Sequence, residues 1–126
     1  MAGLGFPSGH RLHKAVEFSA VFSGRRLLRG ERFDLMHRGN GLPHARLGLV
    51  IPKRQARHAA VRNLVKRQAR EAFRCRGGNL PALDLVLRLT KPLKGPVDDM
   101  QRRALRSEIE ALLSRLPSPE PKELLP

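Results

Sequence analysis

The stretch "AAVRNLVKRQAREAFRCR", residues 59–76, decides the fold because it offers one face to a protein core and another to a polar partner. At about 100° per residue along a helix, one arc of the stretch is apolar. That arc holds Val61, Leu64, Val65, Ala69 and Ala72. The opposite arc, about 140° wide, carries Arg62, Asn63, Lys66, Arg67, Arg70 and Arg74. We therefore predict a helix from about Ala56 to Arg76, packed on a sheet and ended by Gly77.

Besides a phosphate-binding surface, the polar arc admits three interpretations. A solvated helix normally mixes charges of both signs, whereas Arg62, Lys66 and Arg70 stack as like charges with no acid between them. A membrane-surface helix needs bulky apolar side chains, and this apolar arc is mostly Val and Ala. A helix that reads DNA in a helix-turn-helix would follow a short helix and a tight turn, which the sequence does not indicate. The solvated face stays open as the alternative, and we interpret the arc as a phosphate-binding surface.

Charge is distributed unevenly along the 126 residues. The formal net charge is +14, of which residues 1–76 contribute +13 (17 Lys and Arg against 4 Asp and Glu). Residues 77–126 contribute only +1 (8 against 7). Such an excess favours a polyanionic partner, and nucleic acid is the main candidate. The length and a 40% hydrophobic content fit one domain with a small core.

Periodicity predicts three strands and two further helices around the basic helix. We expect a helix over residues 15–23, and strands within "RGERFDLMHR" (29–38), "RLGLVIP" (46–52) and "DLVLRL" (84–89). In the first strand, Phe33 and Leu35 should face one side and Asp34 and Met36 the other. Gly48 marks a bulge or a close approach in the second strand. The order αββαβα is typical of one α+β domain, with strands two and three as parallel neighbours.

The last helix should be capped by Asp98 or Asp99. Its apolar stripe is expected to contain Met100, Ala104, Leu105, Ile109, Leu112, Leu113 and Leu116. We predict no catalytic residue and no metal ligand, because the five histidines are scattered and the single cysteine, Cys75, has no evident partner. No secretion signal or membrane-length apolar run is evident, so a soluble protein of the cytoplasm is expected.

Several of these stretches together resemble a known family. "RNLVKRQAREAFR" is preceded by "RLGLVIPKR" and followed by "LPALDLVLRL", and "EFSAVFSG" lies upstream. The combination resembles the bacterial ribonuclease P protein component from about Arg11 to Leu116. The position that is usually Arg in the family's motif is Leu64 here, so we assign no RNA contact to it.

The resemblance implies a fold and a division of the chain. The fold would be an α+β two-layer sandwich with a left-handed βαβ crossover, as in domain 2 of ribosomal protein S5. The division would be a flexible arm over residues 1–11, the ribonuclease P protein domain over 12–116, and a disordered Pro-rich tail over 117–126.

The implied function is that of the RNA-binding subunit of ribonuclease P, the endoribonuclease that removes the 5′ leader from precursor tRNA. The RNA subunit would carry the catalysis and require Mg²⁺. The protein would bind no cofactor of its own, would hold the leader, and would raise the affinity for substrate and metal ions. Its partners would be the catalytic RNA and the leader, with one protein per RNA and no membrane. The alternative function is a general basic RNA- or DNA-binding module, such as a ribosomal protein.

The implied sites fall into two overlapping sets. The basic motif that contacts RNA would comprise Lys53, Arg54, Arg62, Asn63, Lys66, Arg67 and Arg70. The cleft for the leader would comprise Phe18, Phe22, Met36, Arg62, Asn63, Lys66 and Arg70. Spacing alone predicts that Phe18 and Phe22 belong to the core, and only the resemblance moves one of them toward the cleft. How the cations divide between catalytic RNA and leader stays open at this point.

Overall fold

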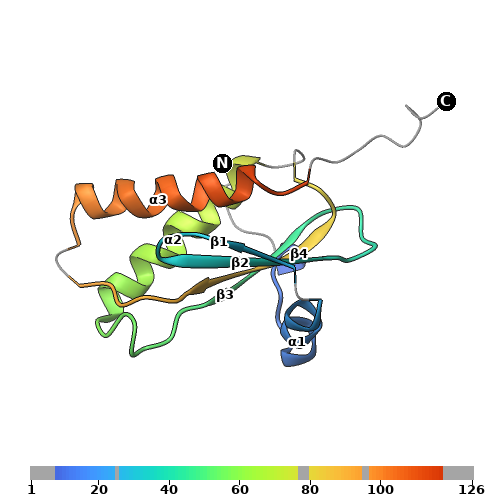
Figure 1. Cartoon of the computed structure of the whole chain (residues 1–126), viewed down its shortest axis with the longest axis horizontal. Coiled ribbons are helices and arrows are strands. Elements are labelled where there is room, and N and C mark those ends of the chain that lie inside the picture. The colour runs from blue at the N-terminus through green and yellow to red at the C-terminus, as the bar shows by residue number, and fades with distance from the viewer. Residues whose placement is uncertain (1–7, 25, 77–79, 95–96, 118–126) are drawn as a thin grey trace.

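Three α-helices and a four-stranded sheet form the fold (Figure 1). The computed structural model describes residues 8–24, 26–76, 80–94 and 97–117. In chain order the elements are the 3₁₀ turn η2 (Ser8–His10), α1 (Ala15–Ser23), β1 (Leu27–Arg29), β2 (Phe33–Gly39), β3 (Arg46–Val50), α2 (Ala59–Arg76), β4 (Leu83–Leu89) and α3 (Asp99–Ser114). The expected tail lies almost wholly outside the described residues, as do residues 1–7 of the expected arm.

The strands lie in the order β1-β2-β4-β3, so β1 and β3 are the two edges. β2 pairs antiparallel with both β1 and β4, whereas β3 pairs parallel with β4. The predicted parallel neighbours are therefore confirmed, and α2 is the crossover between them, since parallel strands need a long connection.

Strand β1 was not predicted. It is only three residues long, too short for an alternating pattern, and the turn that ends it is closed by the Gly30 N–H donating to the Phe33 carbonyl at 2.7 Å.

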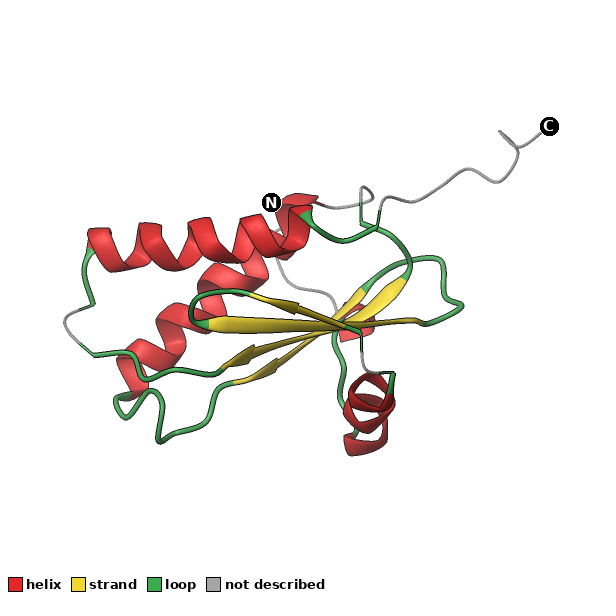
Figure 2. Ribbon diagram, in the orientation of Figure 1, coloured by secondary structure: helices red, strands yellow, loops and turns green. Residues whose placement is uncertain are grey.

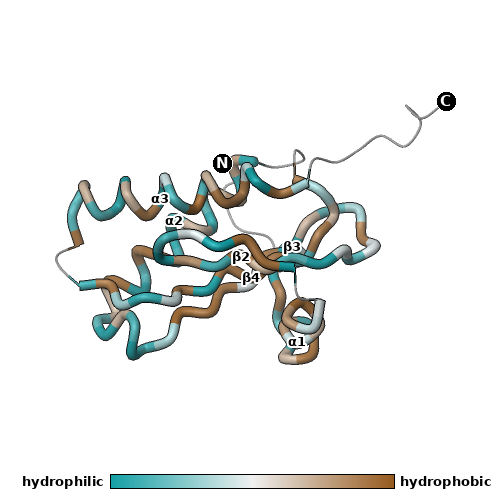
Figure 3. Tube along the Cα trace, in the orientation of Figure 1, coloured by the Kyte–Doolittle hydropathy of each residue, from teal (hydrophilic) through white to brown (hydrophobic). Residues whose placement is uncertain are grey.

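The larger core lies between α2, α3 and one face of the sheet (Figure 2). Phe33 and Leu35 face it from β2 as predicted, and both are fully buried. Leu64 packs against this core, and Phe73 is inside it. In Figure 3 hydrophobic and hydrophilic segments alternate along α2 and α3, which is the pattern of helices buried on one side.

The predicted stripe of α3 is correct from Leu105 onward and wrong at Met100, whose side chain is 79% exposed. Five residues of helix turn Met100 by about 140° away from Leu105, which takes it off the buried stripe. Asp98 is the N-cap, and its carboxylate accepts the Gln101 N–H at 2.9 Å.

Helix α1 covers part of the opposite face of the sheet, so the predicted two-layer description is incomplete. Beneath α1 lies a small second cluster of Leu12, Val21, Met36 and Val86, with Phe18 and Val50 packed against it. Met36 points to this face and Phe33 to the other, as the alternation predicts. The sheet therefore carries a large core on one face and a partly open surface on the other.

One carboxylate fastens α3 to the β1–β2 turn. Glu108 accepts the backbone N–H groups of Arg32 at 2.7 Å and Phe33 at 2.9 Å, and it pairs with the Arg32 guanidinium at 2.9 Å. A Cβ atom on Gly30 would lie 2.5 Å from the Glu108 carboxylate, so a larger residue there would displace the carboxylate from the turn. Glu108 therefore fixes the edge of the sheet against the helix layer.

We predict that Glu108→Ala lowers the free energy of unfolding by about 2 to 4 kcal/mol, because two turn N–H groups and a guanidinium lose a charged acceptor. Urea denaturation followed by circular dichroism measures the change. The matched control is Glu110→Ala on the same helix, whose carboxylate pairs with Arg106 at 2.8 Å and is half exposed. That control should cost about 0 to 1 kcal/mol, and equal losses in the two variants would contradict the role given to Glu108.

Candidate nucleic-acid interface

A groove of about 220 Å³ runs beside β3, an edge strand of the sheet. Its walls come from the segment before α1, from α1 itself and from the outer side of α2. The lining residues are Arg11, Leu12, Phe18, Leu47, Gly48, Leu49, Lys66 and Arg70. Because β3 is an edge strand, the groove combines an apolar floor with a basic helix along one side.

The aromatic wall depends on Gly48. A Cβ atom at this position would lie 2.5 Å from Cε1 and 2.6 Å from Cζ of Phe18, so only glycine lets the ring rest on the strand. The segment before α1 is tied to the same strand, because the Leu12 N–H donates to the Leu47 carbonyl at 3.0 Å and Arg11 bridges to Leu47. The close approach predicted at Gly48 therefore has a specific purpose, which is to place Phe18.

The cationic wall consists of Lys66 and Arg70, which are one helical turn apart and half-buried. Burial and the nearby Arg11 guanidinium both lower the pKa of Arg70. A guanidinium stays protonated in any case, so the lowered pKa means that its positive charge is held at an energetic cost. A phosphate placed in the groove would relieve that cost.

Helix α1 is held over the sheet by an ion-pair network. Arg46 on β3 donates two hydrogen bonds to Asp84 on β4, at 2.8 and 2.7 Å, and one to Glu17 on α1 at 3.1 Å. Hydrogen bonds from the backbone N–H groups of Lys14 and His13, with help from Arg46, lower the pKa of Glu17 from 4.5 to about 2. Arg46 therefore links an acid of the sheet to an acid of α1, and the network orients the helix that carries Phe18.

Two other predicted cleft residues lie elsewhere. Met36 is only 9% exposed and is buried beneath α1, so it supports the helix and does not line the groove. Phe22 is 39% exposed near the end of α1 and is not among the residues that line the groove. Of the two phenylalanines, Phe18 is therefore the one that lines the groove, a distinction that helical spacing could not make.

The remaining residues of the basic motif point in different directions. Arg62 donates to the carbonyls of Ala56 and Arg57, both at 2.9 Å, and so closes the turn before α2. Asn63 and Arg67 line a separate hollow of about 190 Å³ with Ala60, Leu64 and Val97. The basic face of α2 is thus divided between the groove at β3 and a second surface toward α3.

Some lining residues were not found from the sequence. Arg11 was assigned to the arm, although its backbone bridges to β3. Leu12, Leu47 and Leu49 are apolar residues that carry no signal of a site in the sequence, and the fold brings them together along the groove at β3. Lys53 and Arg54 were predicted as RNA contacts, and both are exposed in the turn that precedes α2.

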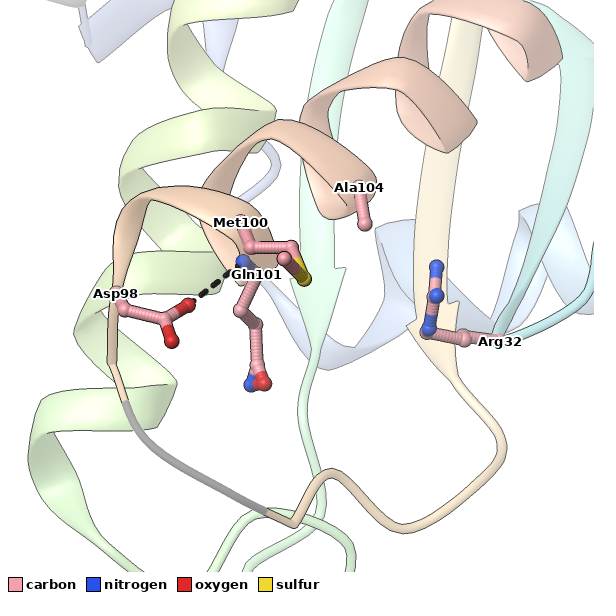
Figure 4. A pocket seen from close by; sticks show the side chains of 5 residues that line it. All are labelled: Arg32, Asp98, Met100, Gln101 and Ala104. Atoms are coloured by element: carbon pink, nitrogen blue, oxygen red, sulfur yellow. Dashed lines mark hydrogen bonds between the residues drawn. The ribbon is translucent and has the colours of Figure 1, made fainter.

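A third hollow, of about 290 Å³, lies at the start of α3 (Figure 4). Asp98, Met100, Gln101 and Ala104 border it from α3, with Arg32 on the other side. It gathers no set of acid–base groups. Across the described residues, no three His, Cys, Asp or Glu side chains are placed to hold a metal ion. Among the helices in these ranges, none has the length and apolar character to cross a bilayer.

Comparison with known proteins identifies the same family along nearly the whole chain. A family model described as Ribonuclease P matches residues 6–117. The ribonuclease P protein component of Azoarcus sp. (strain BH72) is 51% identical over 112 residues, which cover 89% of this chain and 90% of that protein. The component of Bordetella petrii is 44% identical over 116 residues, covering 87% of this chain and 94% of that protein.

Solved structures give the same result for the fold. The ribonuclease P protein from Thermotoga maritima is 30% identical and matches with a TM-score of 0.72, covering 85% of this chain and 97% of that one. The protein from Staphylococcus aureus, at 24% identity, matches with a TM-score of 0.72 over 83% of this chain and 93% of that one.

We predict that Gly48→Ala destabilises the protein by about 1 to 3 kcal/mol, because the added methyl group must displace the Phe18 ring. Thermal denaturation measures the loss. Gly39→Ala is the matched control, since a Cβ atom there meets nothing within 4 Å. The double variant Gly48→Ala/Phe18→Leu should recover part of the loss, and additive losses would show that Phe18 is not the group displaced.

A second prediction concerns pH. A carboxyl whose pKa is lowered by folding stabilises the protein above its unfolded pKa, and this contribution disappears as the pH falls through the folded pKa. For Glu17 that window runs from about 4.5 down to about 2. Wild type should therefore be more stable than Glu17→Gln at pH 6, and the difference should shrink between pH 4.5 and pH 2. Urea denaturation at several pH values checks this, and a difference that is constant with pH would contradict it.

Proposed function

Because this chain belongs to the family of ribonuclease P protein components, we propose that it binds two RNA surfaces at once. One would be the single-stranded 5′ leader of precursor tRNA, and the other the catalytic RNA of ribonuclease P. The proposal assigns these two partners to the two sides of α2. Family membership over residues 6–117 favours this function over a general basic RNA- or DNA-binding module.

The groove at β3 suits the leader. Unpaired bases stack on aromatic side chains while cations meet the backbone, and the groove offers Phe18 on one wall and Lys66 and Arg70 on the other. The two cations are separated by about 6 Å of helix axis, which is comparable to the step between phosphates of an extended strand. This juxtaposition of Phe18 with Lys66 and Arg70 is the single observation that carries the proposal. Arg62 and Met36 have supporting roles in this proposal. Arg62 closes the turn before α2, and Met36 packs beneath α1.

The other side of α2 suits the catalytic RNA. Asn63 and Arg67 lie on the side toward α3, and Lys53 and Arg54 are exposed before the helix begins. None of these four is among the groove residues, so they can meet a second RNA while the groove is filled. Phe22, which lies outside the groove, has no assigned contact in this proposal.

In this proposal the protein carries no bond chemistry. The catalytic RNA, with its Mg²⁺ ions, would cleave the phosphodiester, and the protein would raise the affinity of the complex for precursor and metal ions. One copy would act with each catalytic RNA, in the cytoplasm. The likeness to domain 2 of ribosomal protein S5 and the left hand of the β3–α2–β4 crossover also belong to the proposal. The parallel pairing of β3 with β4 around α2 supplies the βαβ unit that this likeness requires, and the left hand rests on the family resemblance.

The test is cleavage of precursor tRNA by the cognate catalytic RNA at low Mg²⁺, with and without the protein. The protein should restore cleavage and should bind a leader-bearing precursor more tightly than a leaderless tRNA when both are presented to the complex. Strong RNA binding without any effect on cleavage would favour the general basic module.

We predict that Lys66→Ala weakens binding of the leader-bearing precursor on the order of tenfold and makes the salt dependence shallower by about 0.7 units of slope. Arg103→Ala removes one exposed cation on α3 and is the control for net charge, with no change expected in leader discrimination. Phe18→Leu should weaken leader binding with the slope unchanged, because stacking releases no counterions. If Lys66→Ala and Arg103→Ala have equal effects, the groove is not the leader site.

A further inference from the structure

Two loops that are distant in sequence form one unit at the N-terminal end of α2. They are residues 52–58, before α2, and residues 90–94, after β4, and we call them together the basic lobe. The Leu93 N–H donates to the Gln55 carbonyl at 2.7 Å, and the Gln55 side-chain amide donates to the Thr90 carbonyl at 3.0 Å. Figure 1 shows the two loops at the same end of the molecule. Gln55 therefore joins them through both its backbone and its side chain.

The lobe is anchored on the core by one residue of each loop. Ala56 is fully buried, and Leu93 packs against the larger core from the other loop. Pro52 and Pro92 restrict the backbone of each loop. A surface whose backbone is already held in place loses less conformational entropy when it binds. Less of the favourable interaction energy of its charges is then offset by that loss.

The charge of the lobe has one sign only. Neither loop contains Asp or Glu, and the exposed cations are Lys53, Arg54, Arg57, Lys91 and Lys94. The next carboxylates along the chain are already engaged. Asp98 caps α3, and Asp99 pairs with Arg102 at 3.0 Å and Arg103 at 3.7 Å. Five cations on one small surface repel each other unless a polyanion neutralises them.

We propose that Lys91 and Lys94 bind backbone phosphates of the catalytic RNA, on one continuous surface with Lys53 and Arg54. The inference rests on the proposed function and extends it to two residues outside the basic motif. The catalytic RNA fits this surface better than the leader does, because neither loop contains Phe, Tyr or Trp on which an unpaired base could stack. Exposed lysines act as point charges toward phosphates and do not read sequence.

The experiment measures binding of the cognate catalytic RNA alone, without precursor, over a range of salt concentrations. Lys91→Ala/Lys94→Ala should weaken this binding on the order of tenfold and make the slope shallower by about 1.4 to 1.8. The control is Arg26→Ala/Arg38→Ala. It removes the same net charge at the opposite end of the sheet, where both side chains are exposed, and should leave the slope close to that of wild type. All four side chains are exposed, and circular dichroism verifies that each variant is folded.

Gln55→Ala tests whether the Gln55 side chain holds the two loops together. It removes no charge, so it should weaken binding of the catalytic RNA while the salt slope stays that of wild type. A slope as shallow as that of the double lysine variant would contradict the proposal that Gln55 acts only by linking the two loops.

The outcomes separate this inference from the proposed function. If wild type restores cleavage but the double lysine variant binds the catalytic RNA as wild type does, the lobe is not an RNA surface and the inference fails alone. If the variant keeps its affinity for catalytic RNA and loses discrimination for the leader, the lobe binds the leader instead, which also overturns it. If wild type neither binds the catalytic RNA nor restores cleavage, the proposed function itself fails.

Discussion

Burial of one face of α2 sets the position of nearly every residue considered for RNA binding. Val65 and Ala69 are almost completely buried against the sheet, so the helix has a fixed rotation about its axis. That rotation directs Lys66 and Arg70 to the edge of β3, and it directs Asn63 and Arg67 to the side of α3. Helical geometry and a fixed core face are therefore sufficient to divide one basic helix into two surfaces. If the two surfaces bind different RNAs, as proposed, a single domain is sufficient to contact both.

The fold supports this excess of positive charge by placing its carboxylates where they fasten elements together. Glu108 holds the β1–β2 turn to α3, and Asp84 with Glu17 holds Arg46 between the sheet and α1. Arg106 on α3 reaches Glu71 at 3.2 Å, so the acid within the basic helix also serves helix packing. These carboxylates are thus engaged in interactions inside the fold. The groove and the basic lobe keep their positive charge for an external polyanion.

Local periodicity and short apolar runs were sufficient to predict the helices and the three longer strands, because buried faces repeat their apolar residues with the period of the element. Periodicity predicted the two faces of β2, and the order of the elements, with a helix between the two strands, predicted the parallel pairing of β3 with β4. It did not predict β1, which has only three residues and depends on Glu108 from a distant helix. It also could not choose between Phe18 and Phe22, since both fit the same helical spacing and only contact with Gly48 distinguishes them. Nothing in the sequence groups Lys91 and Lys94 with Lys53, because the two loops that carry them are joined by hydrogen bonds between distant residues.

The leucine at position 64 can be understood in the same terms. Resemblance to the family implies an arginine there, yet Leu64 is half-buried, packs against the core and borders the hollow that contains Asn63 and Arg67. Affinity for an RNA backbone depends on how many phosphates are neutralised, and a single residue on the surface can be replaced by others nearby. Arg57, Lys91 and Lys94 supply such charges at the same end of α2, on loops already joined by Gln55. A chain that uses position 64 for packing can therefore keep its electrostatic attraction to RNA, provided that the lobe stays ordered.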